Sequence, residues 1–324
     1  MNDKAVSVLD NYELKVLRTW KGRGAILCDT NQGLKIIKEY IGPKDKLPFI
    51  DKLLLNMREA GQFSVDCLIK NKEDELFSCD RDQVTYIVKD YYDGRECNVK
   101  DIEECEKVVR HLAKMHKFMI LPNSIDKNTF DPTQEEFEKH NRELIKIKKY
   151  IRIKSQKTDF ELFLLKSYDL FLTKAIQVVD DMKRKDLSNA YLDICGKGIY
   201  CHGEFQYHNI MICNSGMAVI NFEKCLIDSQ IRDLYYFMRK VMEKTNWSET
   251  VGNMILESYD KEKTLTTEEK SQLYYRFLYP EKFWKIVNFY YNTGKAWIPG
   301  RNMEKLEKLL KQEEEKMKFL EHYL

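Results

Sequence analysis

The sequence predicts an α+β protein that combines a small strand-rich front part with a mainly helical remainder. Short β-branched and aromatic runs, separated by turn residues, fill most of the first 95 residues. Apolar stripes at helical spacing dominate residues 96–324. A length of 324 residues is generous for a single core and suits two lobes. We therefore expect one lobe over residues 1–95 and a second over residues 96–324.

The front part is expected to form an antiparallel meander with one helix. Its strand-like runs are separated by glycine-containing turns, and the helical stretch carries apolar residues three and four apart. The strands are expected at residues 16–20, 25–28, 34–40, 76–79 and 84–88, and the helix at residues 48–60. The dipeptide Asp93-Gly94 predicts a turn or hinge near residues 90–98.

The remainder is expected to be helical apart from three short strands. One-sided apolar stripes predict long helices, which continue from residue 231 almost to the end with breaks near Pro280 and Pro299. The earlier helices are expected at residues 101–120, 133–153 and 160–185, and the strands at residues 199–201, 210–213 and 218–222.

Composition limits the classes of function. Apolar residues make up 43% of the chain and charged residues 33%, which is typical of a globular protein. The 54 basic and 52 acidic side chains leave a net charge of +2, so we do not expect a dedicated nucleic-acid binder. No apolar signal core or membrane-spanning run is found, and we expect cytoplasmic synthesis without a signal peptide or membrane span. Nine cysteines without a CxxC pair favour reduced thiols.

The most informative stretch is a polar loop between two short apolar strands. The loop reads YCHGEFQYHN from Tyr200 to Asn209, and the sequence AVINFE follows at residues 218–223. This pattern resembles the aminoglycoside-phosphotransferase and choline-kinase-like superfamily, whose catalytic loop reads His-Gly-Asp-x-x-x-x-Asn and whose metal strand reads apolar-Asp-Phe-Asp/Glu. The residues in register are His202, Gly203, Asn209, Ile220, Phe222 and Glu223, with Asp233-Leu234 as a further match.

The resemblance implies a two-lobed protein-kinase-like fold with a nucleotide cleft between the lobes and with ATP and Mg²⁺ as cofactors. Phosphoryl transfer needs a carboxylate that activates the acceptor hydroxyl and oxygen ligands for the metal. The resemblance gives the first role to position 204, metal binding to Asn209 and position 221, and bracing of the loop to His202. It also implies that Lys38, which follows an apolar pair on the third strand, binds phosphate. The turn from Gly22 to Gly24 would then lie over the phosphates.

Two departures from the superfamily pattern affect the expected chemistry. Glu204 stands where the family has Asp, and its additional methylene moves the carboxylate by about 1 Å, a misplacement that costs about a hundredfold in rate. Asn221 replaces a second Asp and lacks the charge that holds a hard cation. Glu223 follows two residues later. We expect it on the same strand face, where it could substitute as a metal ligand.

Two longer segments resemble the CotS family of spore-coat proteins from endospore-forming bacteria. These segments cover residues 219–247 and 279–299, and the similarity extends over about residues 10–320. The second segment lies outside the kinase motifs, which makes it specific. An Asn at the metal position is familiar in that family. The resemblance implies a place in the spore coat, a role in sporulation, other coat proteins as partners, and a kinase-like architecture.

Three functions stay open at this point. The first is a pseudokinase of the coat, weakly active or inactive, that works through protein contacts in coat assembly. The second is an active ATP-dependent phosphotransferase for an aminoglycoside, choline or a sugar, with Glu204 as the base. The third is a nucleotide-binding regulator. A zinc site at His202 and His208 lacks further ligands at the required spacing. The cysteines near the loop are expected to be small buried residues, and a thiol nucleophile is the alternative.

Overall fold

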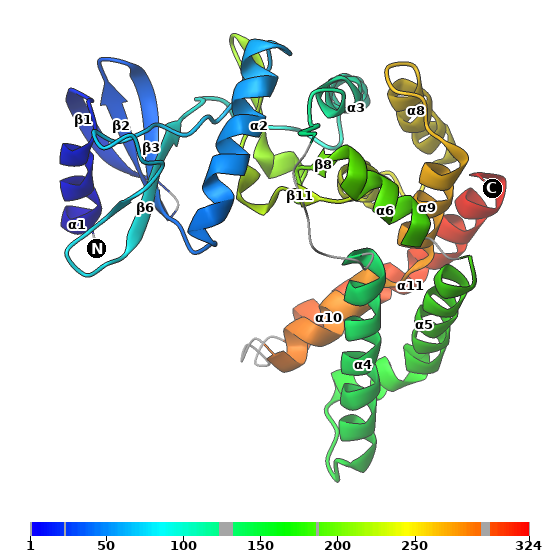
Figure 1. Ribbon diagram of the computed structural model, residues 1–324. Helices are drawn as coiled ribbons and strands as arrows, with labels where there is room; N and C mark the ends of the chain where they lie inside the picture. The colour runs from blue at the N-terminus through cyan, green and yellow to red at the C-terminus, as the bar shows by residue number, and fades with distance from the viewer. Residues whose placement is uncertain (1, 23, 123–131, 186–187, 293–298, 324) are drawn as a thin grey trace. The chain divides into compact units, whose positions relative to one another are not determined.

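The chain is divided into two compact units, the first built from residues 1–121 with 200–226 and the second from residues 122–199 with 227–324. The computed structural model in Figure 1 describes residues 2–22, 24–122, 132–185, 188–292 and 299–323. Two sequence predictions therefore fall partly outside the described residues. They are the glycine turn, at Arg23, and the second coat-protein segment, at residues 293–298.

The first unit contains a five-stranded antiparallel sheet with the strand order β1-β2-β3-β6-β5. The strands are β1 (Val16–Gly22), β2 (Ala25–Thr30), β3 (Gly33–Glu39), β5 (Ser78–Cys79) and β6 (Thr85–Asp90). Gly24 and Gly33 adopt positive φ angles of 70° and 84° in the two turns between the first three strands. The predicted meander of these strands is confirmed. The register sets Lys38 opposite Ile87 and Ile36 opposite Lys89.

Apolar side chains of this sheet are covered by the N-terminal segment. Helix α1 (Asn2–Ser7) and the 3₁₀ turn η1 (Val8–Asn11) pack against the sheet, as Figure 1 shows. The shared cluster consists of Ala5, Val8, Leu9, Tyr12, Ile26, Cys28, Ile37, Tyr86 and Val88. The sequence did not predict this helix, because fewer than two turns give no measurable apolar period.

A second sheet of four strands, in the order β4-β10-β9-β7, positions the polar loop. Its strands are β4 (Ser64–Val65), β7 (Arg95–Glu96), β9 (Ile210–Cys213) and β10 (Gly216–Val219). The hairpin of β9 and β10 is antiparallel, whereas β4 lies parallel to β10 with Val65 opposite Val219. This parallel pair brings residues 64–66 beside residues 219–221, although the two segments are far apart in the sequence.

The chain turns sharply where β10 ends, and here one prediction is wrong. The strand predicted over residues 218–222 stops at Val219, and Phe222–Lys224 form the 3₁₀ turn η4. Asn221 has φ 69° and ψ 55°, a left-handed conformation that Asn tolerates better than most residues. Glu223 therefore does not share a strand face with Asn221, because it belongs to the turn.

Two helices and several short elements complete the first unit. Helix α2 (Leu47–Glu59) has a proline in its first turn and confirms the predicted helix, and α3 (Ile102–His116) begins where Asp101 accepts a hydrogen bond from Glu104 N. The remaining elements are η2 (Lys44–Lys46), β8 (Tyr200–Cys201), η3 (Tyr207–Asn209) and β11 (Leu226–Ile227), where the chain passes to the second unit.

The second unit is helical where it is described. Its helices are α4 (Pro132–Ile153), α5 (Asp159–Arg184), α6 (Ser188–Lys197), α7 (Ile231–Lys244), α8 (Glu249–Asp260), α9 (Thr267–Leu278), α10 (Glu281–Asn292) and α11 (Pro299–Tyr323). Helices α4 and α5 form a long hairpin (Figure 1). Their core with α10 and α11 contains Leu144, Phe160, Tyr168, Phe283 and Leu306. All but α6 follow the predicted stripes.

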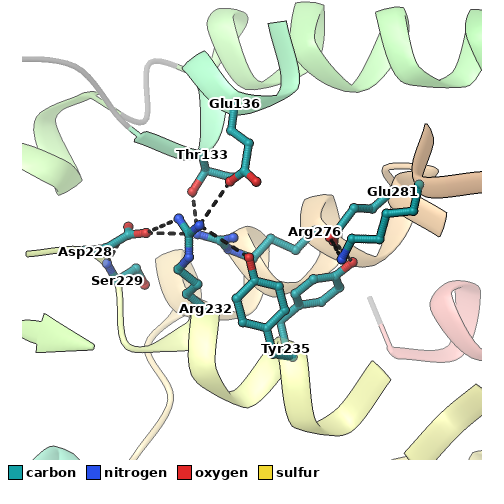
Figure 2. A network of polar contacts seen from close by, with 10 residues as sticks. Thr133, Glu136, Asp228, Ser229, Arg232, Tyr235, Arg276 and Glu281 are labelled. Carbon is teal, nitrogen blue, oxygen red and sulfur yellow. Dashed lines mark hydrogen bonds and ion pairs between the residues drawn. The ribbon is translucent and has the colours of Figure 1, made fainter. Parts of the chain in front are cut away.

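A buried polar network connects three helices of the second unit. Figure 2 shows Asp228, just before α7, facing the guanidinium groups of Arg232 and Arg276. Its Oδ2 accepts hydrogen bonds from Arg232 at 2.9 Å and from Arg276 of α9 at 3.4 Å. On the α4 side, Arg232 pairs with Glu136 at 3.1 Å, and Arg276 contacts Thr133. Since the Asp228 side chain is 2% exposed, these contacts replace the water that it loses.

The antiparallel sheet in the N-terminal region and the mainly helical later part confirm the α+β class. The compact units place α3 and the polar loop with the strands, so they do not follow the boundary expected at residue 95, and the division into lobes stays a prediction. Within the described ranges, none of the helices combines the length and apolarity that crossing a bilayer requires.

Candidate functional site

A cavity of about 460 Å³ lies in the first unit, within the size range of small-molecule sites. Strands β3 and β6, the polar loop and the turn after β10 contribute to its wall. Six of the eight predicted site residues line it: Gly24, Lys38, Glu204, Asn209, Asn221 and Glu223. The remaining two, Gly22 and His202, lie outside the lining.

Two lysines share one carboxylate oxygen in this cavity. Nζ of Lys38 lies 2.9 Å from Oε1 of Glu223, and Nζ of Lys89 lies 2.6 Å from the same oxygen. Lys89 also lies 2.5 Å from Oδ2 of Asp66. The side chains of Lys89 and Asp66 are each only 3% exposed. The centre of the site is therefore a compact set of two ammonium and two carboxylate groups.

The charges of this set support one another. Burial alone would raise the pKa of Glu223, but Lys89 and Lys38 lower it to about 2. Burial also works against the Lys89 ammonium, yet Asp66 and Glu223 together hold the pKa of Lys89 above its ordinary value. Burial raises the pKa of Asp66, and Lys89 acts in the opposite direction. At neutral pH the set is an ion cluster around a positively charged Lys89.

A directional chain of hydrogen bonds runs through the two asparagines. Lys38 Nζ donates to Oδ1 of Asn221 at 3.3 Å, and Nδ2 of Asn221 donates to Oδ1 of Asn209 at 2.9 Å. Nδ2 of Asn209 then donates to the carbonyl oxygen of Glu204 at 2.8 Å. An ammonium group can only donate and a carbonyl can only accept, so the two ends fix the orientation of both amides. Each amide oxygen already accepts a hydrogen bond.

The sharp turn at Asn221 is held from β4. Oδ2 of Asp66 accepts a hydrogen bond from the backbone N–H of Asn221 at 2.8 Å. The parallel pairing of β4 with β10 brings Asp66 to this position. Asp66 thus connects the left-handed residue to Lys89, and backbone and ion cluster form one assembly.

His202 belongs to the polar loop, and its side chain is fully buried. Its Nε2 donates to the carbonyl oxygen of Ile220 at 2.9 Å, and its Nδ1 accepts from Glu204 N at 3.2 Å. The backbone N–H at Glu204 requires an acceptor, which fixes the tautomer. These contacts connect the loop to Ile220, and the bracing role that the superfamily resemblance implies for His202 stays a prediction.

Glu204 lies at the edge of the cavity and is engaged with a neighbouring lysine. Its Oε1 lies 3.1 Å from Nζ of Lys224, and its side chain is 31% exposed. The preceding Gly203 has φ 78°, and a Cβ there would overlap the carbonyl oxygen of Lys224. Close approach of these two backbone segments therefore requires a glycine.

The two predicted glycines of the front turn are placed differently. Gly24, at φ 70°, lines the cavity, and a Cβ built there would meet nothing within 4 Å. Gly22 ends β1, where its nearest side chain is Leu27, and it does not line the cavity. The phosphate-covering role of both glycines stays a prediction.

Sequence reasoning missed Asp66 and Lys89. Lys89 lies in the run TYIVKD of β6, where a strand lysine is normally expected to face water. Asp66 follows a strand of only two residues. The available signal was weak: an isolated charge within an apolar strand, with no partner nearby in the sequence.

The predicted divalent site does not fit the donor set. Glu223 is the one carboxylate among the three predicted ligands, and two ammonium groups already share its Oε1. The oxygens of Asn209 and Asn221 accept hydrogen bonds from different donors. A hard cation prefers several unshared, anionic oxygens.

The zinc and thiol alternatives gain no support from the structure. Among the residues that the structure describes, no group of three or more His, Cys, Asp or Glu side chains could hold a metal ion. Burial raises the pKa of the Cys213 thiol, which disfavours the reactive thiolate.

Comparison with solved structures identifies the fold. The chain is similar to an aminoglycoside phosphotransferase from Alicyclobacillus acidocaldarius, with a TM-score of 0.82, 17% identity and coverage of 98% of this chain and 94% of that one. It is also similar to amicoumacin kinase hAmiN, solved in complex with AMP-PNP, Ca²⁺ and Ami, with a TM-score of 0.59, 12% identity and coverage of 98% and 94%. The protein-kinase-like fold that the sequence predicted is confirmed.

Comparison of sequences identifies the family. The chain is 23% identical to spore coat protein S of Bacillus subtilis (strain 168) over 322 residues, which cover 97% of this chain and 90% of the relative. The predicted resemblance to kinase-like spore-coat proteins is confirmed. Residues 6–323 match the family described as spore coat putative kinase YutH, and the chain belongs to that family.

Proposed function

We propose that the protein is a nucleotide-binding, kinase-like component of the spore coat that transfers phosphate slowly or not at all. In this proposal it contributes to coat assembly mainly through contacts with other coat proteins. The observation that carries the low activity is the hydrogen-bond chain from Lys38 through Asn221 and Asn209 to the backbone of Glu204.

The chain of amides works against metal-assisted transfer. A metal that bridges the phosphates needs ligand oxygens turned toward one point, but here Asn221 donates its amide N–H to the oxygen of Asn209. A divalent ion about 4 Å from an ammonium group is repelled by about 8 kcal/mol at an effective dielectric constant near 20. Lys38 and Lys89, both in contact with Glu223, would impose this repulsion at the third ligand.

The position of Glu204 supports slow chemistry further. A general base must reach the acceptor hydroxyl with a free carboxylate oxygen. Oε1 of Glu204 pairs with Lys224 at 3.1 Å, and the side chain is one methylene longer than the Asp of the superfamily pattern. Even if the pair opens, the longer side chain places the carboxylate differently, which costs about a hundredfold in rate per ångström.

Nucleotide binding is supported by what the cavity retains. It has the volume of a small-molecule site, and Lys38 lies on its wall with a side chain that is 26% exposed. A lysine ammonium is a common phosphate ligand. The structurally similar amicoumacin kinase holds AMP-PNP, which makes a nucleotide the natural ligand to test.

A place in the coat is supported by the family and by spore coat protein S. To test it, coat extracts of spores that carry the wild-type chain or Lys38→Met should be probed with an antibody. Both chains should be found in the coat, because assembly depends on protein contacts. Absence of the wild-type chain from the coat would reject the location, and loss of the folded variant alone would reject independence from the nucleotide.

Nucleotide binding is tested by calorimetry with AMP-PNP and the full chain. Lys38→Met should weaken binding by about tenfold to a hundredfold, the worth of a charge-assisted hydrogen bond. Lys52→Met is the matched control, because Lys52 is exposed on α2 and does not line the cavity. No heat of binding with the wild-type chain, or equal affinity in all three proteins, would contradict a nucleotide at this site.

A further inference from the structure

We propose that Lys89 is a built-in cation that takes the place of a divalent metal ion at Glu223, so that the site binds nucleotide phosphates without magnesium. The nucleotide part of this inference rests on the proposed function, whereas the part that concerns the metal stands on the contacts of Lys89 alone.

The first support is the number of partners that Lys89 holds. Its Nζ lies 2.5 Å from Oδ2 of Asp66 and 2.6 Å from Oε1 of Glu223. Lys35, the other buried lysine of the same sheet, pairs with one carboxylate, Asp90 at 2.8 Å, and donates in addition to the carbonyl oxygen of Gln32 at 2.6 Å. Lys89 instead bridges two carboxylates, which is the arrangement that a metal ion bound at this place would adopt.

The second support is that Lys89 cannot easily move away. Its backbone pairs with Ile36 of β3, and its side chain is 3% exposed. An ammonium group in such a place would lose both carboxylates if it turned aside. Asp66 is itself fixed, because it accepts the backbone N–H of Asn221. The cation is therefore part of the fold.

The third support is the charge balance after a nucleotide has entered. Lys38 and Lys89 now balance Asp66 and Glu223, so the cluster is neutral. When Lys38 turns toward phosphate, Glu223 keeps Lys89 as its partner and needs no additional cation. An incoming Mg²⁺ would meet the positively charged Lys89 at the carboxylate that the superfamily pattern reserves for metal, and these like charges repel each other.

Replacing Lys89 tests the inference without any nucleotide. Lys89→Met leaves Asp66 without a cationic partner and Glu223 with Lys38 alone, and Oδ1 of Asp66 is a buried oxygen without a hydrogen-bond partner among the described residues. The variant should bind Mn²⁺, measured by electron paramagnetic resonance, at least about tenfold more tightly than the wild-type chain. Glu223→Gln added to Lys89→Met should remove the gain, which assigns the ion to this site.

Two further variants control for charge and folding. Lys35→Met removes another buried lysine of the sheet and should leave Mn²⁺ affinity at the wild-type level. Lys89→Met combined with Asp66→Asn removes both buried charges, so that no buried carboxylate is left without a cation to destabilise the fold. It should still bind Mn²⁺ through Glu223 more tightly than wild type does. Tight Mn²⁺ binding by the wild-type chain would overturn the inference. So would the absence of a gain in folded Lys89→Met and in folded Lys89→Met with Asp66→Asn, both of which keep Glu223.

A second experiment, separate from Mn²⁺ binding, tests how the nucleotide binds. AMP-PNP affinity of the wild-type chain should change less than about threefold between EDTA and excess Mg²⁺, whereas Mg²⁺ should tighten binding at least about tenfold when Lys89 is replaced. A tenfold gain from Mg²⁺ in the wild-type chain would contradict the inference. Failure of every chain to bind AMP-PNP would instead reject the proposed nucleotide function, and the Mn²⁺ result would still decide the role of Lys89.

Discussion

Replacing Asp228 by Asn should strongly destabilise the second unit. The carboxylate is 2% exposed and accepts three hydrogen bonds, from Ser229 N at 2.7 Å, from Arg232 at 2.9 Å and from Arg276 at 3.4 Å. Figure 2 shows the two arginines, from α7 and α9, meeting at this one side chain. An Asn at this position keeps an oxygen for Ser229 but points an amide N–H₂ group at guanidinium donors.

The magnitude follows from what remains after the change. Removing one partner of a buried ion pair costs 3–5 kcal/mol in general. Arg232 keeps Glu136 at 3.1 Å, and Arg276 keeps Thr133, so neither guanidinium is left without a partner. We therefore expect the lower end of the range, about 3 kcal/mol, for the free energy of unfolding of the second unit.

Urea unfolding followed by far-ultraviolet circular dichroism measures this loss. Asp169→Asn is the matched control, because Asp169 is 69% exposed and its pairs with Lys148 and Arg152 lie at the surface. That control should lose less than about 1 kcal/mol. A loss of less than about 1 kcal/mol for Asp228→Asn as well would refute the reasoning that this network stabilises the unit.

Three further predictions concern stability. Burial lowers the pKa of Lys316 from 10.5 to about 8, so Lys316→Met should stabilise the chain at pH 7 by up to about 3 kcal/mol. The free energy of unfolding of the wild-type chain, measured by urea titration, should rise between pH 8 and 10.5, because the unfolded state binds more protons than the folded state in that range. The same rise in Lys316→Met would argue against Lys316 as the cause. Gly203→Ala should lower the free energy of unfolding by about 3 kcal/mol, because the residue has a positive φ and a Cβ would overlap the carbonyl oxygen of Lys224. An unchanged melting temperature would show that the loop can move. Thr158→Ala removes a capping box from α5 and should cost about 1 kcal/mol in the same denaturation assay, whereas no loss would mean that packing alone fixes the helix start.

Much of the candidate site could be predicted from the sequence because its residues follow a motif with fixed spacing. Lys38, Asn209, Asn221 and Glu223 come from separate segments, and the structure places them on one cavity. The motif alone could not give the orientation of the amides. That orientation depends on a contact between Lys38 and Asn221, two residues 183 positions apart.

Asp66 and Lys89 could not be predicted for a different reason. Their burial depends on the parallel pairing of β4 with β10 and on the turn at Asn221, which are tertiary events. Local propensity also misled the prediction at residues 220–222, where apolar and aromatic residues favour a strand but the left-handed asparagine ends it. The long helices were predicted well because their apolar stripes extend over many turns.

Phosphate transfer by the wild-type chain is the most direct test of the account. It should be measured with ATP, excess Mg²⁺ and a panel of acceptors that includes aminoglycosides, choline and sugars. Kinases with this chemistry turn over at about 1–100 s⁻¹, and the misplaced Glu204 alone lowers that range about a hundredfold, to about 0.01–1 s⁻¹. We therefore expect every acceptor to be phosphorylated more slowly than about 1 s⁻¹. Turnover of about 1 s⁻¹ or more with any of them would contradict the account.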